Sequence, residues 1–346
     1  MKERIESWPG GIAFALAAWA FAFPTSALQA QDRDAFEAMR SADMRLAAIG
    51  YRLSRAAAPM CDRLEPATGL QLHTLAQYAP GSREAIRTHF RMSGVVAAEG
   101  VIAGSPADRA GIRPDDVIVR IGAIAPPSVS PPDASTAVLE SLYAQLSALP
   151  PQSGIEVIVQ RDGRERSFQV QPEPACRTRY ELRIADTFDA RANGELVQLT
   201  SKYLQTGDPE LLPAVVAHEL AHNILRHRER LDAAGAEFGL ASGFGRNVGL
   251  FRQTEIEADL LSVHILARAG YPLSIAGRFW REIGPQLLRG RIRSRSHPPL
   301  EDRVATVEAE AAKLAAAGPS ASLPAFFAGR HAPLDGNWQP LLVRAR

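Results

Sequence analysis

The chain has 346 residues, of which 46% are hydrophobic, so it is long enough to bury a sizeable core and to form two globular units. Its 39 basic and 38 acidic residues leave a net charge of +1, without a basic run long enough to follow a nucleic-acid backbone. The composition therefore argues against a nucleic-acid partner, a repeat protein and a disordered chain.

The N-terminal segment has the layout of a secretory signal peptide. Lys2 and Arg4 precede an apolar run over residues 12–23, which is followed by a proline and small residues up to Ala30. This run is shorter than the roughly 20 residues that a membrane-spanning helix needs. We expect residues 1–30 to be removed on export, which leaves a periplasmic or otherwise exported soluble protein. An uncleaved anchor is the alternative, and peripheral membrane association stays open.

The next segment predicts one long helix. Apolar residues recur at roughly helical spacing between Asp34 and Met60, and Pro59 is expected to end the helix. Residues 62–90 show only short helical or extended pieces. We assign residues 31–90 to the N-terminal part of a domain that resumes at residue 174.

Residues 91–173 change character, with short β-type runs and turn signals. A hairpin is predicted over residues 155–170, with Asp162 and Gly163 at its turn. The stretch "SPADRAGIRPDDVIVRIG" resembles the signature of PDZ domains, with Asp115 where that family usually has glycine. The resemblance implies an inserted β-rich PDZ-like domain, a type that binds an extended peptide as an added strand. No clear Gly-rich carboxylate loop precedes the signature, so a purely architectural role is an equal alternative.

The two cysteines lie on either side of this segment. Cys61 precedes it and Cys176 follows it. In an oxidising compartment they could form a disulfide, which would join the entry of an inserted domain to its exit. Two unpaired buried thiols are the alternative.

The remaining chain is assigned to a main domain over residues 174–318 and a C-terminal tail over residues 319–346. The expected elements are two strands joined at Asn193-Gly194, then helices from Pro213 past His227, from Thr254 to Gly270 and from Leu300 to Ala316. The Gly-rich stretch from Gly235 to Gly249 is a candidate lid between two of these helices.

The stretch "VVAHELAHNILRH" contains the spacing HExxH. Residues four apart share one face of a helix, so His218 and His222 can offer two imidazoles to one metal ion. Glu219 can then act as general base toward a water molecule at the metal. In the downstream stretch "TEIEADLLSVHILA", Glu255 and Asp259 are also four apart. We predict Glu255 as the third ligand and Asp259 as the acceptor for the free ring N–H of a ligand histidine.

Two neighbouring polar residues receive a structural interpretation. His227 lies beyond the ligands on the same predicted helix. Glu257 is two residues along from Glu255, which turns it away from the metal face of a helix.

The motifs "HELAHNILRH", "EIEAD", "GYPL" and "SHPPLEDR" follow one another in an order that resembles the zinc metallopeptidases related to HtpX, the CAAX prenyl protease, mitochondrial Oma and BepA. The resemblance implies an α+β fold, with a mainly helical zincin-like domain, a small sheet and one Zn²⁺ per chain. It also places that family's His-Pro motif on His297 and the arginine partner on Arg303. His297 is then expected either to donate to the oxyanion or to occupy the open metal position and hold the enzyme inactive.

Together these features predict an exported zinc metalloendopeptidase that acts on proteins or peptides. The compartment and the resemblance imply misfolded or unassembled envelope proteins as substrates, and therefore a role in protein quality control. The alternative is a PDZ-containing adaptor or chaperone-like protein whose zinc site is structural or blocked.

Overall fold

The computed structural model describes residues 25–205, 208–238, 242, 244–288, 296–318 and 322–345. Residues 1–24 of the predicted leader lie outside this part of the chain. The last six residues of the predicted leader, residues 25–30, form the first turns of helix α1 (Thr25–Ala57). No helix in the described ranges has both the length and the apolar character that crossing a membrane requires.

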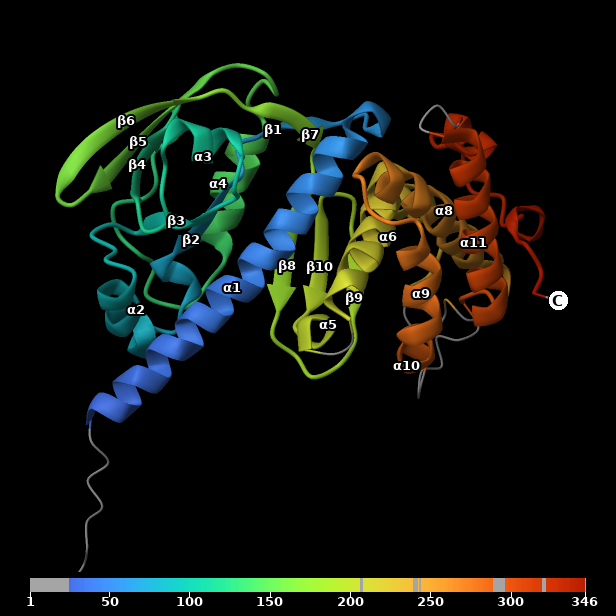
Figure 1. The fold of residues 1–346 in the computed structure, drawn as a ribbon, viewed down its shortest axis with the longest axis horizontal. Coiled ribbons are helices and arrows are strands. Elements are labelled where there is room, and N and C mark those ends of the chain that lie inside the picture. Colours follow the sequence, from blue (N-terminus) through green and yellow to red (C-terminus); the bar gives the residue numbers. More distant parts are fainter. Residues whose placement is uncertain are drawn as a thin grey trace, which may run out of the picture.

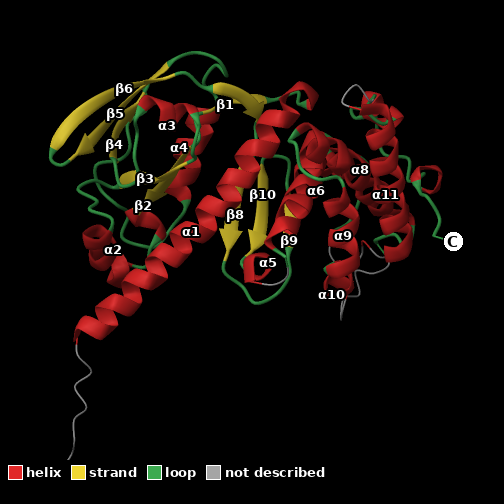
Figure 2. Cartoon of the chain, viewed as in Figure 1, coloured by secondary structure: helices red, strands yellow, loops and turns green. Residues whose placement is uncertain are grey.

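The chain has a mixed α and β structure in which α1 runs diagonally between two units (Figures 1 and 2). Leu46 and Leu53 of α1 lie in the core of the helical unit, which follows residue 178. Phe36, nearer the start of α1, packs against the β-rich unit. The helix ends at Ala57 and continues as a short 3₁₀ turn over Ala58–Met60. One amphipathic helix therefore contributes apolar side chains to both units.

The β-rich unit is built on one antiparallel sheet of five strands in the order β2-β3-β4-β5-β6. The strands are β2 (Leu70–Thr74), β3 (Val96–Val101), β4 (Val117–Ile121), β5 (Ile155–Arg161) and β6 (Arg164–Val170), and the helices are α2 (Arg83–His89), α3 (Pro106–Ala110) and α4 (Ala137–Ser147). The predicted hairpin is confirmed. Asp162 and Gly163 join β5 to β6 with φ angles of 52° and 74°, as a two-residue hairpin turn requires.

The boundary expected at residue 91 does not coincide with the edge of this unit. Strand β2 pairs with β3, and Leu75, Ile86 and Phe90 pack together beneath the sheet. Residues 70–90 therefore belong with the β-rich unit rather than with the domain that follows it. The pairing joins segments separated by a helix, so the local pattern of residues 62–90 could not reveal it.

The entry to the β-rich unit and the exit from it lie side by side. Strand β1 (Leu64–Ala67) pairs antiparallel with β7 (Glu173–Cys176). A disulfide joins Cys61 to Cys176, and their Cα atoms are 5.5 Å apart. The unit is thus an insertion whose two ends are held together by strand pairing and by a covalent bond.

The helical unit combines a three-stranded sheet with a group of helices. Its elements are β8 (Arg179–Arg183), β9 (Ala190–Ala192), β10 (Leu196–Thr200), α5 (Lys202–Gln205), α6 (Leu212–Ile224), α7 (His227–Ala233), α8 (Arg246–Arg268), α9 (Ser274–Glu282), α10 (Gly284–Leu288) and α11 (Leu300–Ala317). The sheet order is β8-β10-β9, so β9 is an edge strand. The turn expected at Asn193-Gly194 joins β9 to β10, while β8 is a third strand that pairs with β10 in parallel.

Two helix predictions are wrong in their bounds. The helix expected to continue past His227 ends at Ile224, because Arg226 adopts the left-handed conformation with φ 56° and starts a new helix, α7. Helix α8 begins at Arg246 rather than near Thr254, so the last part of the candidate lid is helical. Residues 239–241 and 243 of that stretch lie outside the described residues.

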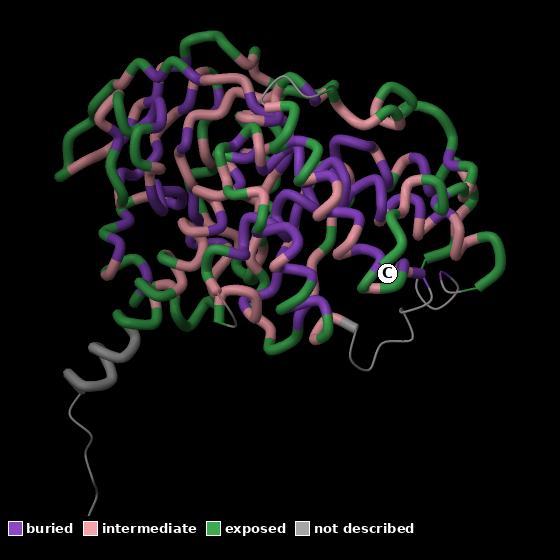
Figure 3. Tube along the Cα trace, turned by 45° about the vertical axis from the view of Figure 1, so that its right-hand side comes forward, coloured by how far each residue is buried: buried purple, intermediate pink, exposed green. Residues whose placement is uncertain are grey.

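The C-terminal segment packs onto the helical unit instead of extending as a separate tail. Leu334 and Trp338 are buried. The backbone N–H of Gly336 donates to the side chain of Gln253 at 2.8 Å, and that of Val343 donates to Thr306 at 2.9 Å. Figure 3 shows buried residues gathered inside the molecule and exposed ones along its outer loops.

Candidate metal centre

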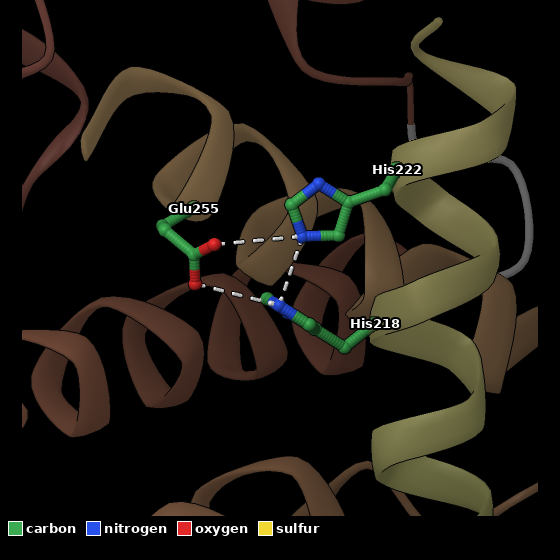
Figure 4. A group of neighbouring side chains, drawn as sticks. All are labelled: His218, His222 and Glu255. Atoms are coloured by element: carbon green, nitrogen blue, oxygen red, sulfur yellow. Dashed lines mark hydrogen bonds and ion pairs between the residues drawn. The ribbon is translucent and has the colours of Figure 1, made fainter. Parts of the chain in front are cut away.

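Two long helices bring the predicted metal ligands together (Figure 4). His218 and His222 extend from the same face of α6, and their Nε2 atoms are 3.1 Å apart. Glu255 reaches them from α8. One of its carboxylate oxygens lies 3.6 Å from Nε2 of His218, and the other lies 3.7 Å from Nε2 of His222. The side chains thus converge from segments that are separated by more than thirty positions in the sequence.

These three residues fit the donor set of a zinc ion. In the described part of the chain they form a cluster in which one donor atom from each residue lies within 4.8 Å of the others. Two imidazoles and one carboxylate are the ligands of several catalytic zinc sites, which keep a fourth position open. The donor types and their convergence therefore suit zinc better than calcium or magnesium, which prefer oxygen ligands.

Asp259 and Arg303 lie behind the first histidine. Oδ1 of Asp259 is 3.0 Å from Nδ1 of His218, the ring nitrogen that faces away from the cluster. Arg303 donates to both oxygens of Asp259, at 2.6 and 2.8 Å, and its Nη2 lies 3.1 Å from Glu255. Its guanidinium also stacks 3.6 Å from the ring centre of Trp280. Arg303 thus contacts the carboxylates that orient or form the cluster.

His297 also reaches the cluster. Its Nε2 lies 3.6 Å from Oε2 of Glu255, the oxygen that also lies nearest to His218. The short segment before α11 carries this side chain, and part of that segment, residues 289–295, lies outside the described residues. The structure therefore brings His297 beside the donor set, where either of its two expected roles is within reach.

A second chain of polar contacts was missed by the sequence interpretation. Nδ1 of His227 lies 2.8 Å from Nδ1 of His222, and Nε2 of His227 lies 3.0 Å from Glu257. Arg230 donates to the same oxygen of Glu257 at 2.7 Å. Glu257 does turn away from Glu255, but toward a histidine that touches a predicted ligand. The five-residue separation of His222 and His227 gave no signal, because the helix break at Arg226 sets their contact.

Glu219 and the cluster share one cavity of about 650 Å³. Apolar side chains line much of it, and edge strand β9 forms one wall; the apolar lining includes Tyr203, Leu231, Phe238, Phe251, Phe279 and Leu287. Burial raises the pKa of Glu219 to about 7. A carboxylate with this pKa can take up and release a proton near neutral pH.

The electrostatics of the cluster favour a positive charge among its donors. Burial opposes a charge on His218, yet Asp259 and Glu255 together raise its pKa to about 10. Burial and the neighbouring charge on His218 lower the pKa of His222 well below its usual value. Although burial acts in the opposite direction, His297, His218 and Arg303 keep the pKa of Glu255 well below that of an ordinary glutamate. The two carboxylates, Asp259 and Glu255, therefore stabilise a positive charge on His218.

A second cavity lies between the two units. Strand β2 is an edge strand whose free side faces α4, because the N–H of Leu72 donates to the hydroxyl of Tyr143 at 2.9 Å. The cavity there measures about 200 Å³. Leu146 of α4 lines it from the β-rich unit, while Ser54 of α1 and Tyr180 of β8 line it from the other side. A groove beside an edge strand is thus closed in part by the helical unit.

A glycine turn precedes this edge strand, although no such loop was recognised in the sequence. Gly69 has a φ of +74°, and a Cβ atom on it would clash with the side chain of Ser105. Its carbonyl accepts a hydrogen bond from the N–H of Ile102 at 2.9 Å. The signal is the short stretch "TGL" before β2, which lies before the expected start of the domain at residue 91.

No protein-family model and no curated protein matches this chain. Solved structures that are similar to it include an HtrA-type protease, AlgW with a decapeptide, at 19% identity and a TM-score of 0.24; the match covers 32% of this chain and 30% of AlgW. Another is the PDZ domain of HtrA3 bound to a phage-derived ligand, at 19% identity and a TM-score of 0.23, covering 33% of this chain and 90% of that domain. The chain thus matches less than a third of the length of AlgW.

Proposed function

We propose that this protein is a zinc-dependent endopeptidase. The observation that carries the proposal is the convergence of His218, His222 and Glu255 in the cavity that also holds Glu219. The three converging residues would hold the ion through two ring nitrogens and a carboxylate. When bound, zinc would supply Lewis acidity that polarises a peptide carbonyl and makes a water molecule more acidic.

The surrounding residues fit this chemistry. Glu219 would take a proton from the attacking water on its carboxylate and pass it to the leaving amine, because it lies in the same cavity as the three predicted ligands. The apolar walls of the cavity would exclude bulk water from the scissile bond. Strand β9 is an edge strand of the described sheet and lies beside the cavity, where an extended substrate could align with it by backbone hydrogen bonds.

The substrate class and the cellular compartment extend this proposal. The motif order described above resembles the zinc metallopeptidases related to HtpX and the periplasmic protein BepA, and the N-terminal residues have the layout of an export signal. A disulfide between Cys61 and Cys176 suits an oxidising compartment. Misfolded or unassembled envelope proteins are the substrates that we propose.

The zinc content and casein cleavage of the wild type and of Glu219→Gln test the enzymatic proposal. We expect both proteins to bind about one zinc ion per chain, since Glu219 is not a ligand. Cleavage by the variant should fall at least about 100-fold, because general-base catalysis contributes that much. Glu84→Gln, at an exposed site on α2, is the control and should cleave like the wild type. Zinc binding without cleavage by any of the three would instead favour the adaptor with a structural zinc site.

A second function, peptide binding by the β-rich unit, is favoured by the position of β2 as an edge strand beside α4. An extended peptide would add to that edge and lie against α4, with an apolar side chain in the cavity beside Leu146. In this position it would contact the helical unit as well. The proposed role of the groove is to hold a substrate segment while another segment enters the metal cavity.

Filling the groove tests this second function. Ala144 of α4 is exposed and lines the cavity, so Ala144→Trp should occupy it and abolish binding of fluorescent peptides that end in an apolar residue. Gln145→Trp, at the next exposed position, changes the same helix outside the residues that line the cavity. Peptide binding that survives Ala144→Trp would exclude this groove as the site.

A further inference from the structure

The helix break at Arg226 places a third histidine against the second predicted ligand. Arg226 has a φ of 56°, and its Nε donates to Glu229 at 2.8 Å, which holds the turn in place. The chain therefore reverses locally, so that His227 lies at the start of α7 with its ring packed on that of His222. His227 is only 2% exposed. Because water cannot reach this buried imidazole, its two ring nitrogens need hydrogen-bond partners within the protein.

The two rings have one arrangement of protons that suits metal binding. Nε2 of His222 faces the cluster, so it must carry a lone pair, and the proton of the neutral ring must lie on Nδ1. That N–H points at Nδ1 of His227, which must then accept the hydrogen bond at 2.8 Å. The proton of His227 is consequently on Nε2, from which it donates to Glu257 at 3.0 Å. The other neutral tautomer of His227 would set two N–H groups against each other.

Glu257 is fixed in turn by two donors. Arg230 donates to one of its oxygens at 2.7 Å, and Gln253 donates to the other at 2.8 Å. Arg230 also donates to the carbonyl of Ala332, and Gln253 accepts from the N–H of Gly336. The C-terminal segment therefore holds in place the two residues, Arg230 and Gln253, that donate to Glu257.

Both predicted ligand histidines thus have an acidic residue and an arginine behind them. Asp259 and Arg303 lie directly behind His218. Behind His222 the corresponding groups are Glu257 and Arg230. They do not touch His222 directly, because the ring of His227 lies between. In metal sites, such outer hydrogen bonds fix the tautomer and orientation of the ligand ring and raise its basicity.

We propose that His227 is a positioning residue, which holds His222 in the tautomer and orientation that present Nε2 to the metal, with Glu257 orienting His227. The inference rests on the metal site of the proposed function. It does not depend on peptidase activity, since its consequence is a higher affinity of the site for zinc.

Zinc affinity, measured by competition with a chromogenic chelator, tests this role. His227→Phe keeps an aromatic ring but removes the acceptor, and we expect it to weaken zinc binding about 10- to 100-fold. His227→Gln can accept from His222 and donate to Glu257, so it should restore much of the lost affinity. His264→Phe is the matched control. It removes a histidine of α8 that is equally buried and pairs with Glu310 at 2.8 Å, outside the residues that line the cavity of the donor set. This variant should bind zinc like the wild type.

Nitrogen-15 NMR of the histidine rings gives a readout that does not depend on these variants. In the zinc-loaded wild type we expect the proton of His222 on Nδ1 and that of His227 on Nε2. The opposite tautomer of His227, or a zinc affinity of a folded His227→Phe equal to that of the wild type, would overturn the inference. If the wild type binds zinc but cleaves nothing, the proposed function fails while these two measurements still decide the role of His227. A wild type that binds no zinc would overturn both.

Discussion

At the scale of single residues, buried charges occur in this protein where a specific partner compensates them. Arg303 is 3% exposed and lies between Asp259 and Glu255, while Arg230 lies against Glu257. Removing one partner of such a pair leaves an uncompensated charge in a medium of low polarity, which is strongly destabilising. Replacing the charged side chains around the three predicted ligands is therefore expected to cost stability, and such compensated pairs suit a site that must hold its residues in fixed orientations.

A buried carboxyl pair predicts a pH-dependent stability. Asp43 of α1 lies against Glu99 of β3, which is 4% exposed. Burial raises the pKa of Asp43 from 3.8 to about 6, and burial together with Asp43 raises the pKa of Glu99 well above its usual value. The folded protein thus keeps a proton that the unfolded chain has released. The protonated pair therefore contributes its full stabilisation of the fold below about pH 4, and this contribution is lost as the pH rises through about 6.

Asp43→Asn tests this dependence. Relative to the variant, the wild type should lose up to about 3 kcal/mol of unfolding free energy between pH 4 and pH 7, since each pKa unit corresponds to about 1.4 kcal/mol. Urea denaturation of both proteins across this range measures the difference, in which the titration of groups other than Asp43 and its partner Glu99 cancels. A difference that stays constant with pH would contradict the assignment.

At the scale of elements, the turn before β2 sets the edge of the groove. Gly69 needs a left-handed backbone and also lies against Ser105, whereas Gly163, in the β5–β6 turn, has the same φ of +74° with open space around it. The two glycines therefore share a backbone conformation, but Gly69 is buried without room for a Cβ atom and Gly163 is exposed with room for one.

Alanine substitutions at these two glycines should separate backbone strain from steric overlap. Gly163→Ala is expected to cost about 1 kcal/mol of unfolding free energy for the left-handed conformation alone. Gly69→Ala should cost about 3 kcal/mol, because the new methyl group also displaces Ser105. Denaturant unfolding of both variants measures the costs. Equal losses would show that the contact with Ser105 relaxes freely.

At the scale of the whole molecule, the disulfide closes the insertion at its base. Cys61 and Cys176 are separated by 115 positions. A crosslink that closes a loop of this length removes much of the conformational entropy of the unfolded chain. The bond also lies beside the β1 and β7 pair, so both features hold the two units at one junction.

Replacing both cysteines by serine should lower the unfolding free energy by about 4 kcal/mol. Unfolding should be measured with and without a thiol reductant. The wild type should lose stability in the reductant, whereas the Cys61→Ser/Cys176→Ser variant should be insensitive to it. A wild type that is unaffected by complete reduction would argue against a stabilising disulfide.

The local sequence was sufficient to predict those features that depend on spacing within one element. His218, Glu219 and His222 follow from helical periodicity, and the β5–β6 hairpin follows from the Asp162-Gly163 turn, because neighbours along the chain decide both. The same reasoning predicted Glu255 as a partner, since its motif occupies a helix of its own.

Only the tertiary structure decided which distant groups meet. It joined β2 to the five-stranded sheet, placed Arg303 against Asp259 and brought His227 to His222. The last contact depends on Arg226 adopting a left-handed conformation that is unfavourable for arginine by itself. Such a conformation is stable only when the surrounding packing and hydrogen bonds compensate its cost, and those are properties of the folded chain rather than of any short segment.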